Sequence, residues 1–526
     1  MDDSPDDSLD ASLDDSTTGD TAMAAGARWS TTWDELKSYY AELSCLETAA
    51  EVLAWDERTY MPPAAGLYRS EQLTLLAGLA HQRRTSPRLG EWLATLSTLP
   101  VGTLPEEVAV SVRWLVRDYD RNTKLPQSLV EALTRATSRG QQVWETARAA
   151  NDYAAFRPYL AEIVRLKREQ AAALGYTKSP YDPLLDEYEP GATVAWLTPL
   201  LAELRDRIVP LVDAIHQRRP NPDDSLLHRH FPVDRQRQLG CQTATEFGFD
   251  FRRGRLDVTH HPFCLTAGPD DCRITTRFHD HDFSMAYFGI LHEAGHGLYE
   301  QGLPREQFGL PLGCAASLGV HESQSRMWEN FVGRHPSFWQ YVFPQAQNLF
   351  PESLGDVDVE SFWQAINVVR PSLIRVEADE VTYNLHIVIR FELEQALIAG
   401  ELEVDELPSA WNQRYQSYLG LTPPSDADGV MQDVHWSAGL FGYFPTYSLG
   451  NLYAAMLWDA LGRDLGDRDL LLAQGNFRPV LDWLRANVHA HGRRWPAAEL
   501  VERACGGPPS SAPLVRYLTD RFLGAS

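Results

Sequence analysis

The sequence predicts a large, mainly α-helical protein that carries one small antiparallel β-sheet. Apolar residues recur every three or four positions in long stretches, for example over residues 36–43 and 159–166, and this spacing is typical of helices with one buried face. Between residues 251 and 278, β-branched residues instead alternate roughly with polar ones, as in strands. A chain of 526 residues, 44% of them hydrophobic, can bury a large core.

The chain begins with an acidic segment, residues 1–25, in which eight aspartates precede the first positive charge. Such a segment cannot bury enough apolar surface to fold alone, so we predict that it is disordered. Residues 26–526 are predicted to form a single folded domain, which consists of a helical scaffold over residues 26–250, a sheet and cleft region over 251–447, and closing helices over 448–526.

Proline and glycine divide the scaffold into separate helices, with breaks at residues 61–66, 125–126 and 179–183. The pair Trp55-Asp56 and the stretch 180–191 are unusual in composition, but neither has the spacing of a metal site. We interpret both as packing and turn elements.

The strand-like region consists of residues 255–259 and 272–278, with Gly268 and Pro269 between them as a turn. This order predicts a small antiparallel sheet immediately before the next helix.

The overall composition restricts the class of partner and the location. The formal net charge of -25 disfavours nucleic acid and anionic membranes as partners. No uncharged apolar run of about 18 residues occurs, and the N-terminus does not resemble a secretion signal, so we expect a cytoplasmic protein without a membrane span. The six scattered cysteines are expected to be reduced thiols.

The helix expected within residues 286–300 contains His292, Glu293 and His296. Histidines four residues apart lie on one face of a helix, where both can bind one zinc ion, and the glutamate between them can accept a proton from a metal-bound water. An amphipathic helix could carry the same residues without a function, but composition alone predicts only about 0.07 such pairs in the chain. The spacing is typical of a zinc metallopeptidase.

A catalytic zinc ion keeps three protein ligands and one open position, so a third ligand is required. After the glycine- and proline-rich connection 302–319, a helix is expected over residues 320–329, and it offers His321 and Glu322 side by side. The spacing favours Glu322, because a carboxylate would complete a set of two histidines and one glutamate, but it leaves His321 open.

A further long helix is expected from Pro371 to Ala399, followed by Gly400. Its polar residues recur at three- or four-residue steps, which fits a solvated face about as well as a cleft wall; they are Arg375, Asp379, Thr382, His386 and Arg390. Aromatic, glycine-broken loops follow at residues 429–436 and 442–447 and contribute His435, Tyr443 and Tyr447. Loops of this kind suit a substrate cleft.

Six motifs, in this order along the chain, resemble those of the carboxypeptidase Taq family of zinc metallocarboxypeptidases. They are His-Pro-Phe at 261–263, Asp-Cys-Arg-Ile-Thr at 271–275, the run 292–301, His-Glu-Ser-Gln-Ser-Arg at 321–326, Ile-Arg-Val-Glu-Ala-Asp at 374–379, and Gly-Val-Met-Gln-Asp-Val-His-Trp at 429–436. The resemblance extends from about residue 35 to the C-terminus. It implies a mainly helical subunit with a deep active-site groove, one zinc ion per subunit for which cobalt can substitute, a homodimer, and removal of single C-terminal residues from peptides with broad specificity.

The resemblance also implies roles for individual residues. His292, His296 and Glu322 correspond to the zinc ligands, and Glu293 corresponds to the general base. A more distant likeness to other HExxH peptidases with a glutamate as third ligand implies that His435 and Tyr443 stabilise the tetrahedral oxyanion.

A carboxypeptidase needs a cation that holds the substrate carboxylate, and the arginine fork suits this anion. Arg273, Arg326, Arg375 and Arg390 are the candidates near the motifs. Arg326 can pair with a carboxylate on its own helix. Arg390 would lie about 22 Å from Arg375 along one continuous helix, so Arg375 and Arg390 would not share an anion. We predict Arg375, with Tyr443 or Tyr447 beside it, and keep Arg273 and a simple pair between Arg375 and Asp379 as alternatives.

Two other functions remain open at this stage. One is a zinc endopeptidase or dipeptidase with the same metal site, and the other is an inactive helical protein that binds partners. The complete set of His292, Glu293, His296 and Glu322 argues against the second.

Overall fold

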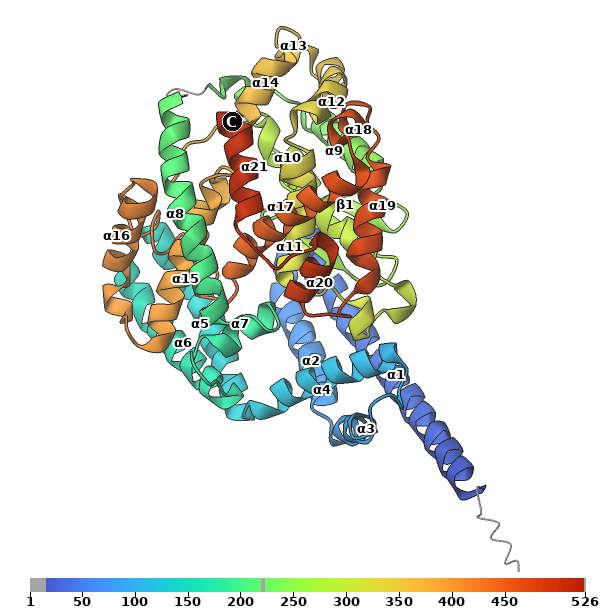
Figure 1. The fold of residues 1–526 in the computed structure, drawn as a ribbon. Coiled ribbons are helices and arrows are strands. Elements are labelled where there is room, and N and C mark those ends of the chain that lie inside the picture. Colours follow the sequence, from blue (N-terminus) through green and yellow to red (C-terminus); the bar gives the residue numbers. More distant parts are fainter. Residues whose placement is uncertain (1–15, 219–222, 525–526) are drawn as a thin grey trace, which may run out of the picture.

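The computed structural model describes residues 16–218 and 223–524 (Figure 1). Of the head for which we predicted disorder, residues 1–15 lie outside the described residues, and helix α1 begins at Ser16. None of the described helices is both long and apolar enough to cross a membrane.

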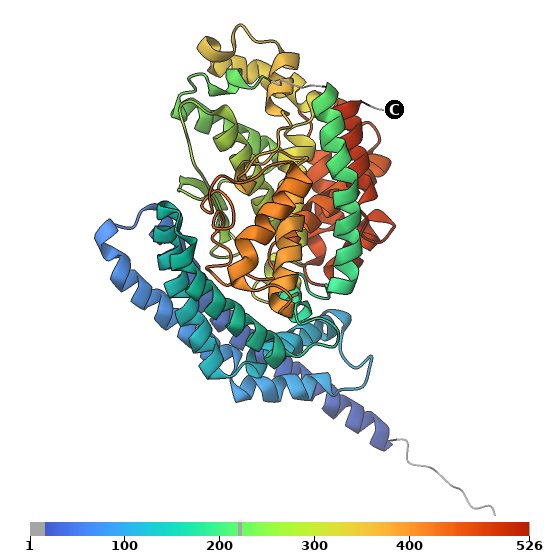
Figure 2. The same ribbon diagram turned by 90° about the vertical axis from the view of Figure 1, so that its left-hand side faces the viewer.

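The predicted helical scaffold is confirmed. Its helices form one layer of the molecule, coloured blue to teal in Figure 2, and then continue along the side of the remaining domain. They are α1 (Ser16–Thr59), α2 (Gly66–Arg84), α3 (Pro87–Ser97), α4 (Glu106–Lys124), α5 (Gln127–Ala150), α6 (Tyr153–Leu174), α7 (Asp182–Tyr188), α8 (Val194–Arg218) and α9 (Val233–Phe247). Three of the breaks between them fall at the predicted prolines and glycines, at residues 61–66, 125–126 and 179–183, and the other breaks were not predicted.

The small sheet is mixed, so the prediction of a purely antiparallel sheet was wrong. It contains β1 (Gly254–Val258), β2 (Cys264–Thr266) and β3 (Cys272–Thr276) in the order β1-β3-β2. The predicted turn at Gly268 and Pro269 does join antiparallel strands, but they are β2 and β3. β1 pairs with β3 in parallel, because the chain crosses over before it enters β2.

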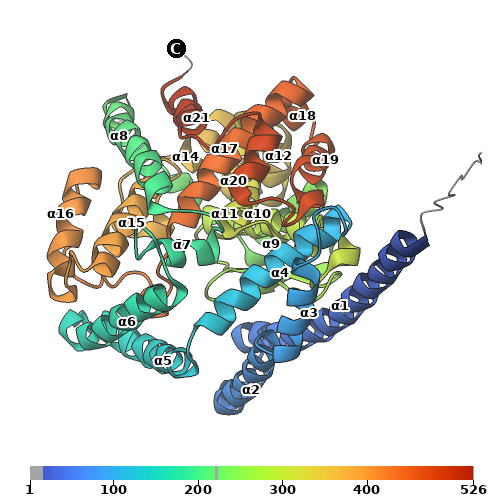
Figure 3. The same cartoon turned by 60° about the horizontal axis from the view of Figure 1, so that its bottom comes forward.

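Three helices lie in the middle of the molecule, between α8 and α15 on one side and α19 on the other (Figures 1 and 3). They are α10 (Phe283–Glu300), α11 (Leu318–Arg326) and α17 (Pro445–Leu465). Helix α11 packs against both α10 and α17, and the sheet packs against α10. A π-helical segment, Met327–Val332, continues α11. Nearly all side chains on the buried face of α10 belong to the main hydrophobic core.

Further helices surround these three and close the domain. They are α12 (Pro336–Leu349), α13 (Pro351–Leu354), α14 (Val359–Ile366), α15 (Tyr383–Ala399), α16 (Leu407–Leu419), α18 (Arg468–Ala473), α19 (Arg478–Asn487), α20 (Ala497–Cys505) and α21 (Ala512–Leu523). Of the region after residue 448, which we predicted to close the domain, α18 to α21 lie around the central helices, whereas α17 begins at Pro445 and is itself one of the three helices in the middle.

The helix predicted from Pro371 to Ala399 begins only at Tyr383, so the prediction was wrong over its first half. The cause is Asp379, whose Oδ1 accepts hydrogen bonds from the backbone N–H groups of Val381 and Thr382 at 2.9 and 3.0 Å. A short polar side chain that binds nearby backbone N–H groups favours a turn over a continuing helix. Gly400 ends the helix in the left-handed conformation, with φ of 78°, as predicted.

Candidate metal centre

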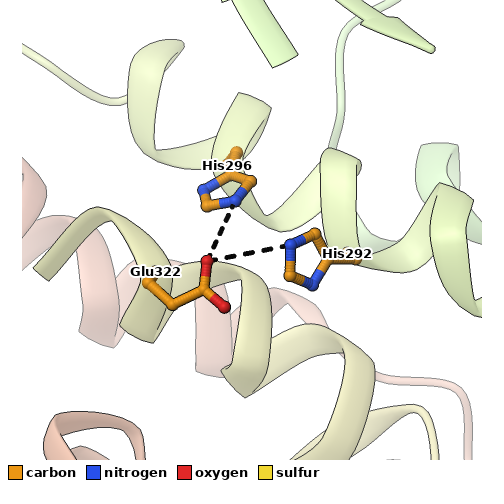
Figure 4. Close-up of side chains that lie close together, drawn as sticks. All are labelled: His292, His296 and Glu322. Carbon is orange, nitrogen blue, oxygen red and sulfur yellow. Dashed lines mark ion pairs between the residues drawn. The ribbon is translucent and has the colours of Figure 1, made fainter. Parts of the chain in front are cut away.

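Helix α10 presents two imidazoles on one face. The side chain of Asp282 caps its N-terminus by accepting a hydrogen bond from the backbone N–H of Met285 at 2.9 Å. His292 and His296 follow one turn apart, with ring centroids 4.9 Å apart and ring planes at 84°. Their Nε2 atoms both face α11 (Figure 4).

Glu322 on α11 completes a group of three possible ligands. Its Oε2 lies 3.8 Å from Nε2 of His292 and 3.5 Å from Nε2 of His296. The ligand atoms of these three residues all lie within 4.8 Å of one another, and no other such group of three or more occurs among the described residues. The geometry therefore fits a divalent metal ion held by two histidines and one glutamate.

His321, the alternative third ligand, points elsewhere. Its Nε2 lies 2.9 Å from Oε1 of Glu300 at the end of α10. Its ring stacks on that of His296, with centroids 4.4 Å apart. The tertiary structure thus brings Glu322, rather than His321, into the group with the two α10 histidines.

The Nδ1 atoms of both α10 histidines have partners that orient the rings. Nδ1 of His292 lies 2.8 Å from Oε2 of Glu329, and Nδ1 of His296 donates to the backbone carbonyl of His321 at 3.0 Å. Since each Nδ1 is engaged, each Nε2 remains available as a ligand. Glu329 lies in the π-helical segment, and sequence reasoning missed it because this irregular turn has no sequence signal.

Arg326 keeps the carboxylates of this centre ionised. Its Nε donates to Oε1 of Glu322 at 2.7 Å, and its Nη1 donates to Glu329 at 3.2 Å. Burial opposes the charge of Glu322, but Arg326 and the two histidines hold the pKa of this carboxyl well below its usual range. A permanently ionised Glu322 suits a metal ligand.

Glu293 lies beside the three possible ligands without belonging to their group. It is only 6% exposed, and burial raises the pKa of its carboxyl to about 7. A carboxyl with a raised pKa can both accept and donate a proton near neutral pH.

Glu189, which the sequence did not single out, holds the start of α11. Its carboxylate accepts hydrogen bonds from the backbone N–H of Gly319 at 3.1 Å and from the hydroxyl of Tyr453 at 2.9 Å. The stretch 180–191 is thus a structural element, as interpreted, and it supports the helix that carries Glu322.

A second polar cluster forms around Asp433. Arg375 donates to Oδ1 of Asp433 from Nε at 3.1 Å and from Nη2 at 2.8 Å, and Arg390 donates to Oδ2 from Nε at 2.7 Å. Both arginines therefore bind one anion, which contradicts the prediction that they are too far apart. The reason is that Arg375 precedes α15 and folds back beside it.

The alternative pair between Arg375 and Asp379 is also absent from the ion pairs of the described residues. Arg375 binds Asp433, and Asp379 accepts hydrogen bonds within the turn before α15. Arg375 is 5% exposed, and its Nη1 donates to the hydroxyl of Tyr383 at 2.9 Å. Three of its five N–H groups are thus engaged, and two remain for a ligand.

The aromatic loop brings His435 and Tyr443 together, but the loop predicted over residues 442–447 ends at Phe444, and Tyr447 lies in the first turn of α17. Nε2 of His435 lies 3.2 Å from the hydroxyl of Tyr447, and the ring of Tyr443 lies 5.5 Å from that of His435. The guanidinium carbon of Arg375 lies 5.1 Å from the ring centroid of Tyr447. Nδ1 of His435 has no hydrogen-bond partner among the described residues, and burial lowers the pKa of this imidazole to about 3.

The loop is held by Glu394, another residue that sequence reasoning missed. Its carboxylate accepts hydrogen bonds from the indole of Trp436 at 2.7 Å, from the backbone N–H of Gly442 at 2.9 Å, and from the hydroxyl of Tyr181. A buried carboxylate in the middle of a helix has no local signal that distinguishes it from a solvated one.

Arg273 lies apart from this cluster, on β3. Both oxygens of Asp271 hold its guanidinium, at 2.8 and 2.7 Å, and the guanidinium carbon lies 4.2 Å from the ring centroid of Trp55. The pair Trp55-Asp56 is a packing element, as interpreted, since Arg255 also contacts the Trp55 ring.

Comparison with known proteins extends over almost the whole chain. The family described as "Carboxypeptidase Taq (M32) metallopeptidase" matches residues 35–522. The chain is 47% identical over 500 residues to thermostable carboxypeptidase 1 of Thermus thermophilus, and this alignment covers 93% of this chain and 98% of the relative. It is 39% identical over 485 residues to carboxypeptidase 1 of Bacillus subtilis, which covers 92% and 95% of the two chains.

Solved structures show the same fold. The crystal structure of an M32 carboxypeptidase from Deinococcus radiodurans R1 superposes with a TM-score of 0.91 at 40% identity, which covers 94% of this chain and 99% of that one. Trypanosoma cruzi metallocarboxypeptidase 1 gives a TM-score of 0.88 at 33% identity over 94% and 99% of the two chains.

Proposed function

This chain is a metallocarboxypeptidase of the carboxypeptidase Taq (M32) family, and from that premise we propose that it uses zinc to remove single C-terminal amino acids from peptides with broad specificity. The observation that carries the proposal is the convergence of His292, His296 and Glu322 within 4.8 Å, with Glu293 on the same helix. Two imidazoles and one carboxylate are a typical ligand set for catalytic zinc, and cobalt can substitute for zinc in such a site.

In the proposed mechanism, His292, His296 and Glu322 hold the metal. When bound, zinc polarises the scissile carbonyl and lowers the pKa of water to about 7. Glu293 accepts the proton of the attacking water and donates it to the leaving amine, a role that its raised pKa supports. Glu329 and the carbonyl of His321 keep the two imidazoles oriented.

We propose that the aromatic loop provides the oxyanion donors. His435 is buried and Tyr443 is half-buried, and both lie beside Tyr447. The pKa of Tyr443 is raised to about 12 by burial and by the negative charge of Glu322, so its hydroxyl stays protonated and can donate. Donors that are already positioned stabilise a developing oxyanion without reorganising.

The substrate carboxylate is proposed to bind at Arg375. This arginine keeps two free N–H groups and is surrounded by the rings of Tyr383 and Tyr447. Asp433 neutralises only part of the charge in this cluster, because Arg390 binds the same carboxylate. A cluster with a net positive charge attracts an anion. Arg273 remains the alternative, although Asp271 already neutralises it.

We further propose, from the family resemblance, that the chain forms homodimers, and, from its sequence composition and cysteines, that it works in the cytoplasm. All six cysteines are free thiols in the structure, which supports a reducing compartment. Light scattering of the purified protein measures the oligomeric state.

A time course of digestion separates the candidate functions. A peptide with a blocked N-terminus is incubated with the metal-loaded enzyme and analysed by mass spectrometry. Our proposal expects stepwise loss of single residues from the C-terminus. Internal cuts would identify an endopeptidase, release of dipeptides a dipeptidase, and an unchanged peptide an inactive binding protein.

A further inference from the structure

Two cysteine thiols lie against each other beside the metal helix. Sγ of Cys264 on β2 is 3.7 Å from Sγ of Cys272 on β3. Neither cysteine forms a disulfide in the structure. Cys272 is buried, whereas Cys264 is half-buried and lines a cavity of about 360 Å³, together with Arg58 of α1 and Phe263. A small oxidant can therefore reach one member of the pair.

The register of the sheet places the two cysteines at diagonal positions. Cys264 pairs with Ile274, and Cys272 pairs with Thr266. The Cα atoms of diagonal neighbours are typically about 7–8 Å apart, whereas a disulfide usually needs a Cα separation of about 4.4–6.8 Å and an S–S bond of about 2.05 Å. A bond between these sulfurs would therefore shift the short strand β2 along its own axis and draw it closer to β3.

Movement of β2 reaches the metal site through a continuous chain of contacts. The hydroxyl of Thr266 on β2 donates to Oε2 of Glu300 at 3.1 Å, and Oε1 of the same carboxylate lies 2.9 Å from Nε2 of His321. The ring of His321 stacks on His296. The backbone carbonyl of His321 is the group that orients His296.

The second cysteine contacts the metal helix directly. A Cβ atom placed on Gly297 would lie 3.3 Å from Sγ of Cys272, so this sulfur packs against α10 one residue beyond His296. The pair is thus linked to the metal site along two routes, through β2 and its contacts and through the packing of Cys272 against α10.

We propose that Cys264 and Cys272 are a redox modification site, which a hydroperoxide converts reversibly into a disulfide that lowers peptidase activity. One sulfur attacks the peroxide O–O bond, which gives a sulfenic acid and one water. The second sulfur then displaces the hydroxyl as another water and forms the S–S bond. Two thiols lose two hydrogen atoms in total, and one hydrogen peroxide is reduced to two waters. A dithiol reductant reverses the bond by exchange.

The surroundings set the rate of this reaction. The hydrogen bond with Cys272 and burial raise the pKa of the Cys264 thiol well above its usual range. Since the thiolate is the nucleophile, oxidation is slow at neutral pH and becomes faster as the pH rises. The pair therefore responds to sustained rather than brief oxidation.

The test uses the full-length, metal-loaded enzyme treated with hydrogen peroxide. Trypsin releases residues 256–273, cut after Arg255 and Arg273, as one peptide that contains both cysteines. The bond then appears as the loss of two hydrogen atoms and as resistance to alkylation. We expect the disulfide-bonded form of this peptide to accumulate while the activity falls by about tenfold or more, the usual range for disturbed outer-shell partners of a metal ligand. Dithiothreitol should restore both the free thiols and the activity.

Variants and metal analysis complete the test. Cys264→Ser and Cys264→Ala should be active and insensitive to peroxide, whereas Cys314→Ser, which alters a cysteine in another part of the chain, should remain sensitive. A peptide that stays fully alkylated after the activity has fallen would overturn the disulfide. A complete disulfide with unchanged activity and metal content would overturn its coupling to the metal site.

The effect on activity rests on the proposed function, but the bond does not. If the enzyme shows no carboxypeptidase activity even before oxidation, that result counts against the proposed function alone. Peptide mapping then still decides whether the disulfide forms.

Discussion

A Cβ atom on Gly450 of α17 would lie 2.4 Å from Cγ of Glu322. This distance is shorter than any ordinary carbon contact, so only glycine allows α17 to pack as closely as it does against α11. The backbone of α17 therefore helps to fix the position of the third proposed metal ligand.

Gly450→Ala is predicted to weaken metal binding without changing a ligand. The added methyl group must displace either Glu322 or the α17 backbone, and disturbances of this kind cost about 10–100-fold in metal affinity or activity. Competition with a chelator measures the affinity. Gly78→Ala in α2 is the control, since nothing lies within 4 Å of its added Cβ. An unchanged affinity in Gly450→Ala would show that this contact is not limiting.

Alanine substitutions at His292, His296 and Glu322 are each expected to lower metal content and activity together. Each removes one of three protein ligands. Metal is measured by mass spectrometry after dialysis, and activity lost with a chelator should return with zinc or cobalt. His321→Ala is the matched control and should retain metal, because the backbone of His321, not its side chain, binds His296. The opposite pattern, with metal kept in Glu322→Ala and lost in His321→Ala, would reverse our assignment.

Glu293→Gln should separate catalysis from metal binding. The amide has nearly the same shape but cannot accept the proton of water, and loss of a general base typically lowers the rate by about 10²–10⁴-fold. We expect full metal content and unchanged peptide binding with this fall in kcat. A turnover within a few-fold of the wild type would rule out the proposed role.

The role of Arg375 is tested with a peptide as its free acid and as its C-terminal amide. The wild type should hydrolyse the acid faster than the amide. In Arg375→Ala the ratio of the two rates should fall by at least about tenfold while the metal content stays unchanged, because the buried partner of the substrate carboxylate is removed. Asp433 remains paired with Arg390 in this variant. If the preference instead survives and disappears in Arg273→Ala, the carboxylate binds at the strand.

Stability is expected to depend on pH through Glu189. Burial raises the pKa of this carboxyl from 4.5 to about 7, so the folded protein binds more protons than the unfolded chain in this interval. The stability that Glu189 contributes is therefore complete below the unfolded pKa and decreases as the pH rises toward the folded value.

Glu189→Gln keeps an acceptor oxygen for Gly319 and carries no charge. Its Tm relative to the wild type should therefore rise between pH 4.5 and about pH 7, the two pKa values of Glu189, and then level off. Thermal unfolding of the metal-free protein measures this, with the exposed Glu502→Gln as control. A difference in Tm that stays constant over this range would contradict the raised pKa.

The sequence alone determined the features that depend on local spacing. His292 and His296 are four residues apart, and helix geometry alone brings them together on one face. Three of the helix breaks in the scaffold were also predictable, because clustered prolines and glycines disfavour a continuing helix. The loop that carries His435 and Tyr443 was recognisable from its glycines and aromatic residues, whereas Tyr447 lies in α17.

Only the tertiary structure decided how distant segments meet. The parallel pairing of β1 with β3 and the shared binding of Asp433 by Arg375 and Arg390 depend on contacts between residues far apart in the chain. Periodicity along one segment carries no information about which segment packs against it. For the same reason, the space that a glycine at position 450 leaves for Glu322 could be found only after α11 and α17 had been placed side by side.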